Sequence, residues 1–131
     1  MNHVAEGEFT VKLVPLPMEG QPEDSMLGRT SIEKTISGDL IAESTGQMLS
    51  AVTRVEGSAG YVAVERVEGS LHGRKGSFVL QHSGSMDRGA PRLLVSVVPD
   101  SGTDELIGIS GEFKIIIADG KHSYRFSYSL P

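Results

Sequence analysis

Apolar residues recur mainly at every second position along the chain, and turn-forming residues interrupt them about every 8–15 positions. Such alternation is typical of strands that bury one face in an antiparallel sheet. Residues 122–130 are the clearest case, because histidine, tyrosine, phenylalanine and leucine alternate there with serine and arginine. The pattern predicts strands over residues 5–14, 28–36, 40–52, 61–67, 77–83, 92–98, 112–118 and 122–130.

The segments between these strands are rich in turn residues. Prolines and acidic residues in 15–26 predict a surface loop, since proline cannot donate to a strand ladder. The glycines of 69–76 predict a bulged or short connecting segment, and residues 45–46 predict a bulge within the third strand. A longer connection over 99–111 has room for a short helical turn. Further turns are expected over 84–91 and 119–121.

These elements predict an all-β fold. An open sheet of eight strands would leave an apolar face in water and two edges unpaired. Closure into an eight-stranded antiparallel β-barrel removes both problems and leaves an interior that side chains or one small ligand can fill. A two-sheet sandwich is the alternative. No composition shift or repeat marks a boundary, so residues 1–131 are expected to form a single domain.

The amino-acid composition excludes several classes of function. The chain has 131 residues, no cysteine, 12 Lys+Arg and 17 Asp+Glu, which gives a formal net charge of -5. The lack of cysteine excludes thiol catalysis, thiolate zinc sites and disulfides, and it favours a reducing compartment. The acidic balance argues against a nucleic-acid partner. No apolar run approaches the roughly 18–20 residues that span a bilayer, and no signal peptide is visible, so we expect a cytoplasmic protein without a membrane partner.

Several segments, taken in order along the chain, resemble one known family. They are KTISGDL (34–40), GYVAVER (60–66), GRKGSFVLQHSG (73–84), VPDSGTDELIGISG (98–111) and the ending DGKHSY (119–124). They resemble the DUF3224 family over nearly the whole chain. The resemblance implies a small protein of a mostly bacterial family without an assigned function, and a fold similar to the allene oxide cyclase and dirigent barrels. It transfers no active residues, because those of the cyclase and dirigent proteins cannot be placed on this chain.

Six polar side chains fall on the same face of their strands as the apolar residues, so they are candidates for a site in the barrel interior. They are Lys34, Tyr61, Glu65, His82, Tyr124 and Tyr128. A carboxylate, a histidine and tyrosines that converge in an apolar cavity suit proton transfer or the anchoring of a small ligand. Burial is expected to raise the pKa of Glu65 towards neutrality, and a nearby carboxylate would hold one histidine tautomer. His82 is the strongest candidate, because it belongs to a polar end of an otherwise apolar strand.

The tyrosines and Glu65 also have a structural interpretation. The tyrosines could be core aromatics with a solvated hydroxyl, and Glu65 could belong to a charged outer face with Arg66 and Glu68. A metal held by Glu65 with His72, His82 and His122 is a further alternative, but the spacings match no known ligand pattern. We therefore expect neither a metal nor a cofactor.

Three classes of function remain. The first is a barrel that binds a small apolar ligand, and the second is an isomerase or cyclase, by analogy of fold alone. The third is a non-catalytic oligomer that interacts through its outer wall. We expect a homo-oligomer, because apolar residues also occupy the outer phase of the strands. They are Val62, Val64, Val79, Leu94, Val98 and Ile116.

Overall fold

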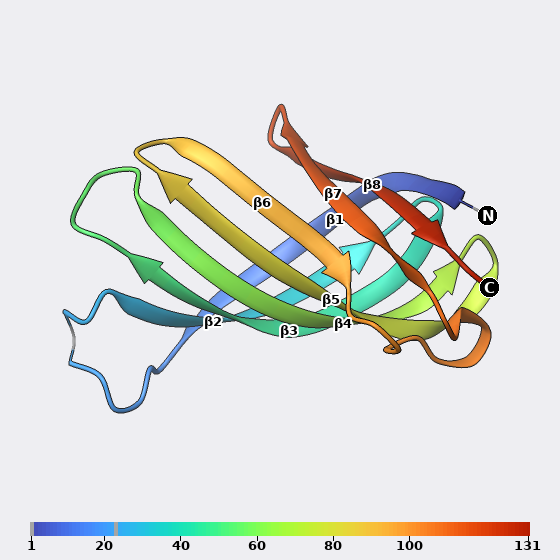
Figure 1. Ribbon diagram of the computed structural model, residues 1–131, viewed down its shortest axis with the longest axis horizontal. Coiled ribbons are helices and arrows are strands. Elements are labelled where there is room, and N and C mark those ends of the chain that lie inside the picture. The colour runs from blue at the N-terminus through green and yellow to red at the C-terminus, as the bar shows by residue number, and fades with distance from the viewer. Residues whose placement is uncertain (1, 23) are drawn as a thin grey trace.

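The computed structural model describes residues 2–22 and 24–131, and within them eight strands and one short 3-10 helix follow one another (Figure 1). The elements are β1 (Asn2–Leu16), β2 (Leu27–Ile36), β3 (Leu40–Val52), β4 (Ala59–Leu71), β5 (Arg74–Asp87), β6 (Ala90–Val97), η1 (Asp104–Leu106), β7 (Ser110–Ala118) and β8 (Lys121–Ser129). The 3-10 helix lies within the connection that the sequence assigned to a short helical turn.

Each strand pairs antiparallel with the next, and β1 also pairs with β8, so the sheet closes into a barrel. The predicted all-β, eight-stranded antiparallel barrel is confirmed for the described residues, and the two-sheet sandwich is wrong. Within the same part of the chain, no helix is long and apolar enough to cross a membrane.

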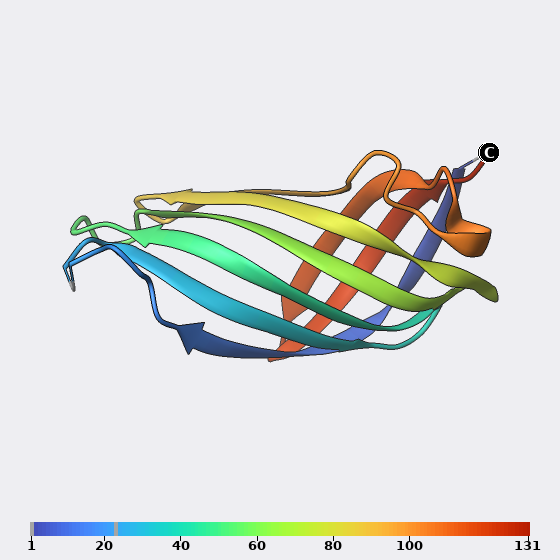
Figure 2. The ribbon, with the colours of Figure 1, turned by 90° about the horizontal axis from the view of Figure 1, so that it is seen from below.

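The barrel is closed over one half of its length and opens along the other half. Strand β1 pairs with β8 over Asn2–Phe9 and with β2 over Phe9–Leu16. Strand β6 meets β7 at the pair Ser96 and Glu112, so the preceding part of β6 runs beyond the paired region. In Figure 2 the long strands run side by side, and the β7–β8 hairpin crosses them steeply. The inner face of the long strands therefore extends beyond the closed part of the barrel.

Aromatic side chains fill the closed half. The Phe113 ring stacks on Tyr124 at 5.1 Å between centroids and meets Phe126 at 5.6 Å. Phe126 in turn stacks on Phe78 at 5.5 Å and on Tyr128 at 5.3 Å. All five side chains are buried, and each aromatic pair adds about 0.5–1.5 kcal/mol beyond its burial. The closed half is thus a packed core.

Two connections are shorter than the sequence predicted. The proposed connecting segment over 69–76 is wrong, because β4 and β5 continue to a two-residue turn at His72 and Gly73. Both residues have positive φ (47° and 82°), as a tight hairpin requires. The turn expected over 84–91 likewise shrinks to residues 88–89. Polar residues at these strand ends face solvent, so polarity alone did not mark where the strands stop.

The first loop and the third strand also differ in detail. Strand β1 continues through Pro15 and Leu16, so the predicted loop over 15–26 begins later, and its residue 23 lies outside the described residues. The bulge predicted at residues 45–46 is wrong, because β3 pairs without interruption, with Gly46 opposite Ile32 on one side and Glu65 on the other. A Cβ at Gly46 would lie 2.1 Å from the Val64 carbonyl oxygen, so glycine serves close strand approach there.

Candidate binding site

Four polar side chains from four successive strands meet inside the barrel. Glu65 Oε2 lies 2.8 Å from Lys34 Nζ and 2.5 Å from His82 Nε2, and the Ser44 hydroxyl donates to Glu65 Oε1 at 2.6 Å. All four side chains are buried, and Glu65 is only 1% exposed. Both carboxylate oxygens therefore have partners, which a buried charge requires. We call these four residues the polar cluster.

The strand register explains why these side chains can meet. Lys34 stands directly opposite Ser44, while Gly46 stands opposite Glu65, and Ala63 opposite His82. The glycine and the alanine leave room between the strands for the longer charged side chains. The Lys34 ammonium also lies 4.9 Å from the centre of the Phe9 ring, a cation–π arrangement.

The polar cluster keeps Glu65 ionised. Burial by itself would raise the pKa of the carboxyl, but the His82 hydrogen bond, the Lys34 ammonium and the Ser44 hydroxyl together lower that pKa to about 2. The raised pKa that the sequence led us to expect is wrong, because the His82 hydrogen bond and the Lys34 ammonium, which comes from the non-adjacent β2, outweigh the effect of burial. An ionised carboxylate only accepts hydrogen bonds, so His82 carries its hydrogen on Nε2, and Nδ1 is free to accept when the ring is neutral.

Tyr61 lies between the polar cluster and a cavity at one end of the barrel. Its hydroxyl lies 3.5 Å from His82 Nδ1, at the outer limit of a hydrogen bond. Burial, followed by the charge of Glu65, raises the pKa of Tyr61, so the phenol keeps its proton at neutral pH. The ring lies over Gly84, where an added Cβ would come within 2.5 Å of a ring carbon. Glycine at 84 therefore sets the position of the ring.

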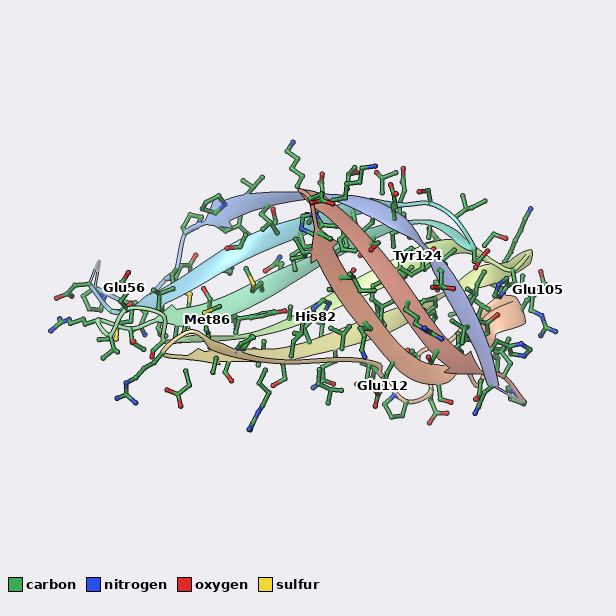
Figure 3. All side chains as sticks on the ribbon, turned by 90° about the horizontal axis from the view of Figure 1, so that it is seen from above. Glu56, His82, Met86, Glu105, Glu112 and Tyr124 are labelled. Carbon is green, nitrogen blue, oxygen red and sulfur yellow. The ribbon has the colours of Figure 1, made fainter. Side chains whose placement is uncertain are left out.

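A cavity of about 530 Å³ begins at Tyr61 and opens at the rim of the barrel. We call it the rim cavity. It is lined by Met48, Ser50, Val52, Ala59, Gly60, Tyr61, Gly84, Ser85, Met86, Pro91, Arg92, Leu93 and Ile117. Figure 3 shows His82 near the middle of the molecule, Met86 towards the rim, and Tyr124 in the opposite, closed half. Val52, Met86, Leu93 and Ile117 are between 44% and 67% exposed, so this inner surface is apolar and accessible.

The other two candidate tyrosines lie away from the polar cluster. The Tyr124 hydroxyl accepts from the Leu40 N–H at 3.0 Å and donates to the Ser37 carbonyl at 2.8 Å, so it fastens the β2–β3 turn. The Tyr128 hydroxyl is hydrogen-bonded to His72 Nδ1 at the closed end. Of the six predicted candidates, the structure thus brings together Lys34, Tyr61, Glu65 and His82, and it places the two other tyrosines in structural positions.

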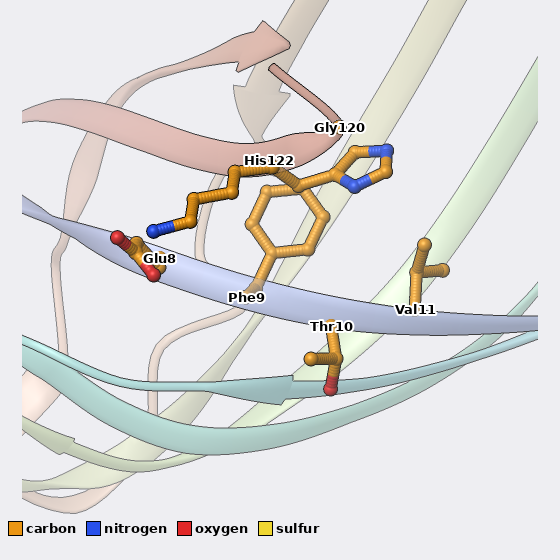
Figure 4. Close-up of a pocket in the computed structure, with 7 residues that line it drawn as sticks. Glu8, Phe9, Thr10, Val11, Gly120 and His122 are labelled. Atoms are coloured by element: carbon orange, nitrogen blue, oxygen red, sulfur yellow. The ribbon is translucent and has the colours of Figure 1, made fainter. Parts of the chain in front are cut away.

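His122 lines a second, smaller space in the wall of the barrel. This pocket of about 310 Å³ lies where β8 begins and β1 continues along β2, and Figure 4 shows the Phe9 ring beside His122. The two rings are 5.3 Å apart. His122 and Lys34 thus lie against the same Phe9 ring, whereas His72 lies with Tyr128 at the closed end. In the part of the chain that the structure describes, no three His, Cys, Asp or Glu side chains are grouped to hold a metal ion.

Sequence reasoning missed two parts of the site. Ser44 is in phase with Leu40 and Ala42, so the alternation of β3 could have indicated that it points inward. In the apolar lining of the rim cavity, Met86 belongs to a segment that the sequence assigned to a turn, while Leu93 belongs to a predicted strand but was given no role. The polar residues around Met86 did not show that β5 continues to Asp87.

The fold and the site define a small antiparallel β-barrel with an ionised polar cluster at mid-length and an apolar cavity at one end. The chain belongs to the DUF3224 family of proteins of unknown function, whose family model matches residues 5–128. The resemblance drawn from the sequence segments is thereby confirmed.

A solved structure supports the same assignment. The chain is similar to a DUF3224 protein of unknown function from Shewanella oneidensis MR-1, with 48% sequence identity and a TM-score of 0.94. The match covers 100% of this chain and 98% of that one. No protein with curated annotation matches the chain. The likeness to allene oxide cyclase and dirigent barrels stays a prediction.

Proposed function

We propose that the protein binds a small apolar molecule in the rim cavity. The single observation that carries this proposal is an accessible apolar cavity whose lining includes Tyr61, the residue whose hydroxyl lies near His82 of the polar cluster. Ligand sites are typically cavities of about 300–1,000 Å³ with a few polar groups among apolar walls, and a cavity of about 530 Å³ falls within that range. In the closed half, the described aromatic side chains are buried against one another.

A pair of neighbouring residues on β6 tests the proposal. Leu93 lines the rim cavity and is 47% exposed, whereas Leu94 faces outward and is 52% exposed. Leu93→Gln should weaken binding of Nile red, a neutral apolar dye, about fivefold in a fluorescence titration, because about 1 kcal/mol of apolar contact is lost. Leu94→Gln is the matched control and should leave the Kd unchanged. Equal effects of both substitutions, or no binding by the unaltered protein, would refute the proposal.

An isomerase or cyclase remains the second candidate, and one observation favours it. Such an enzyme needs a carboxylate, a histidine and a tyrosine within reach of one another beside a cavity. Glu65, His82 and Tyr61 meet this requirement. Glu65 Oε2 lies 2.5 Å from His82 Nε2, and the Tyr61 hydroxyl lies 3.5 Å from His82 Nδ1. Fold analogy adds nothing to the choice of reaction, since one fold hosts unrelated chemistries.

Assembly through the outer wall also stays a prediction. Val62, Val64, Leu94 and Ile116 are exposed on the outer face, between 43% and 54%, and an apolar wall of this kind favours contact with a second copy. Cytoplasmic location is likewise a prediction that rests on composition.

A further inference from the structure

The charges of the polar cluster balance only while His82 is neutral. Lys34 and Glu65 form a buried pair at 2.8 Å, and their charges cancel. A proton added to His82 would leave the cluster with one net positive charge inside the barrel. An uncompensated buried charge is unfavourable, so an anion placed beside His82 and a proton on His82 stabilise each other.

The added proton can bind to only one of the two ring nitrogens of His82. Nε2 of His82 already carries the hydrogen that Glu65 accepts, so protonation occurs on Nδ1, the nitrogen that faces Tyr61. In the neutral ring Nδ1 accepts from the Tyr61 hydroxyl. In the charged ring Nδ1–H donates to the Tyr61 oxygen instead, and the hydrogen of Tyr61 becomes free to turn towards the rim cavity. Protonation thus converts Tyr61 from a hydrogen-bond acceptor for the ligand into a donor.

The surroundings of His82 contain few other ionisable groups. Glu65 and Tyr61 face it from β4, and Lys34 reaches the same carboxylate from β2. The residues directly opposite on the flanking strands, Ala63 on β4 and Val95 on β6, are apolar. Ser44 of β3 is neutral and hydrogen-bonded to Glu65. The Phe9 ring lies 4.9 Å from Lys34 Nζ and 5.3 Å from the His122 ring, so His122 of β8 is a further ionisable group near the polar cluster. Since Glu65 stays ionised far below neutral pH, His82 is the group of the polar cluster itself that can take up a proton near neutrality.

The lining of the rim cavity does not oppose a negative head group. None of the lining residues in the described part of the chain is acidic, and Arg92 stands at the rim on the outward phase of β6, as Leu94 does. We propose that the rim cavity binds an amphipathic carboxylic acid as its anion, with the apolar tail towards Met86 and Leu93 and the carboxylate on the Tyr61 hydroxyl, and that binding takes up one proton at His82. This ligand class rests on the proposed function, because it concerns the same cavity.

The step involves a proton and no covalent change in the ligand. Solvent supplies the proton to Nδ1, the Tyr61 hydroxyl donates to the carboxylate, and the imidazolium is held between Glu65 and the Tyr61 oxygen. A neutral alcohol of the same length can bind with Tyr61 as acceptor and His82 neutral. Its binding should therefore take up no proton, which separates the two ligands experimentally.

Isothermal titration calorimetry of the full chain with decanoate and with decanol tests this inference. Titrations at pH 8 in phosphate and in Tris buffer give the number of protons taken up, because the two buffers differ in ionisation enthalpy. We expect nearly one proton for decanoate and none for decanol. The Kd of decanoate should rise by up to about tenfold per pH unit above neutrality, as linkage to a single proton requires.

Variants locate the proton. Tyr61→Phe should weaken decanoate about tenfold and decanol less, because it removes a hydrogen bond to a charged group. His82→Gln, whose amide can still donate to Glu65, should abolish proton uptake, and the matched control His122→Gln should retain it. Binding of both ligands without proton uptake, or uptake that survives in His82→Gln, would overturn the inference and leave the proposed function standing. Failure of decanol, decanoate and Nile red to bind would overturn both.

Discussion

Acid should destabilise this protein by about 3 kcal/mol through Glu65 alone. The ordinary pKa of the carboxyl is 4.5, and the polar cluster lowers that pKa to about 2 in the folded protein. Each pKa unit corresponds to about 1.4 kcal/mol, so the difference amounts to about 3 kcal/mol of folding free energy. Glu65 is 1% exposed, and solvent screening therefore does not reduce this figure substantially.

The sign follows from which state binds the proton first. Above pH 4.5 the carboxyl is ionised in both states, and the whole contribution to stability is present. As the pH falls below 4.5 the unfolded chain takes up the proton while the folded protein does not, so stability declines. By pH 3 about 2 kcal/mol is lost, and the rest disappears as the pH falls through about 2.

Urea denaturation at pH 6, 5, 4 and 3, followed by circular dichroism, measures this loss. The unaltered protein should lose about 2 kcal/mol more between pH 6 and pH 3 than Glu65→Gln does. Glu33→Gln, which removes an exposed carboxylate next to Lys34 in the chain, should keep the slope of the unaltered protein. Because Glu65→Gln leaves the Lys34 ammonium buried without its counter-ion, the double variant Lys34→Met with Glu65→Gln provides a second comparison with both charges removed. Identical slopes in all four proteins would refute the role given to Glu65.

Two further predictions concern the strands and turns that position the site. Gly46→Ala should destabilise the protein by more than about 2 kcal/mol in the same urea assay, because the new Cβ would lie 2.1 Å from a backbone oxygen of β4. Gly60→Ala is the control and should be nearly neutral, because the atom nearest to its new Cβ would be 3.7 Å away. Tyr124→Phe should cost about 1–3 kcal/mol, because it leaves the buried Leu40 N–H without its hydroxyl partner. A loss below 0.5 kcal/mol in either Gly46→Ala or Tyr124→Phe would contradict the corresponding contact.

The alternation of apolar and polar residues was sufficient to predict the barrel but not where its strands end or where the barrel opens. Every strand buries one face, so the period of two predicted the number of strands and the inward direction of side chains such as Glu65 and His82. The ends of β4 and β5 were missed because exposed polar residues look alike in a strand and in a turn. Whether the barrel opens at one end depends on where β6 and β7 part, which no local pattern encodes.

Four residues of the site, Lys34, Tyr61, Glu65 and His82, were predictable from the alternation, but the electrostatics of the site were not. Lys34 and Glu65 are 31 positions apart and belong to strands separated by β3, so their contact depends on the register of two strand pairs and on the curvature of the barrel. Without that contact, burial alone suggested a raised pKa for Glu65, whereas the ammonium and the His82 hydrogen bond lower it. The sequence therefore predicted the residues, and the packing determined their charge.

The most direct measurement for the central claim is a crystal structure of the protein with decanol. We expect the alkyl chain in the rim cavity against Met86 and Leu93, with its hydroxyl at hydrogen-bond distance from the Tyr61 oxygen. A crystal that shows decanol only on the outer wall beside Val62 and Val64, or that shows the cavity closed by the strand ends, would contradict the claim that this cavity is the binding site.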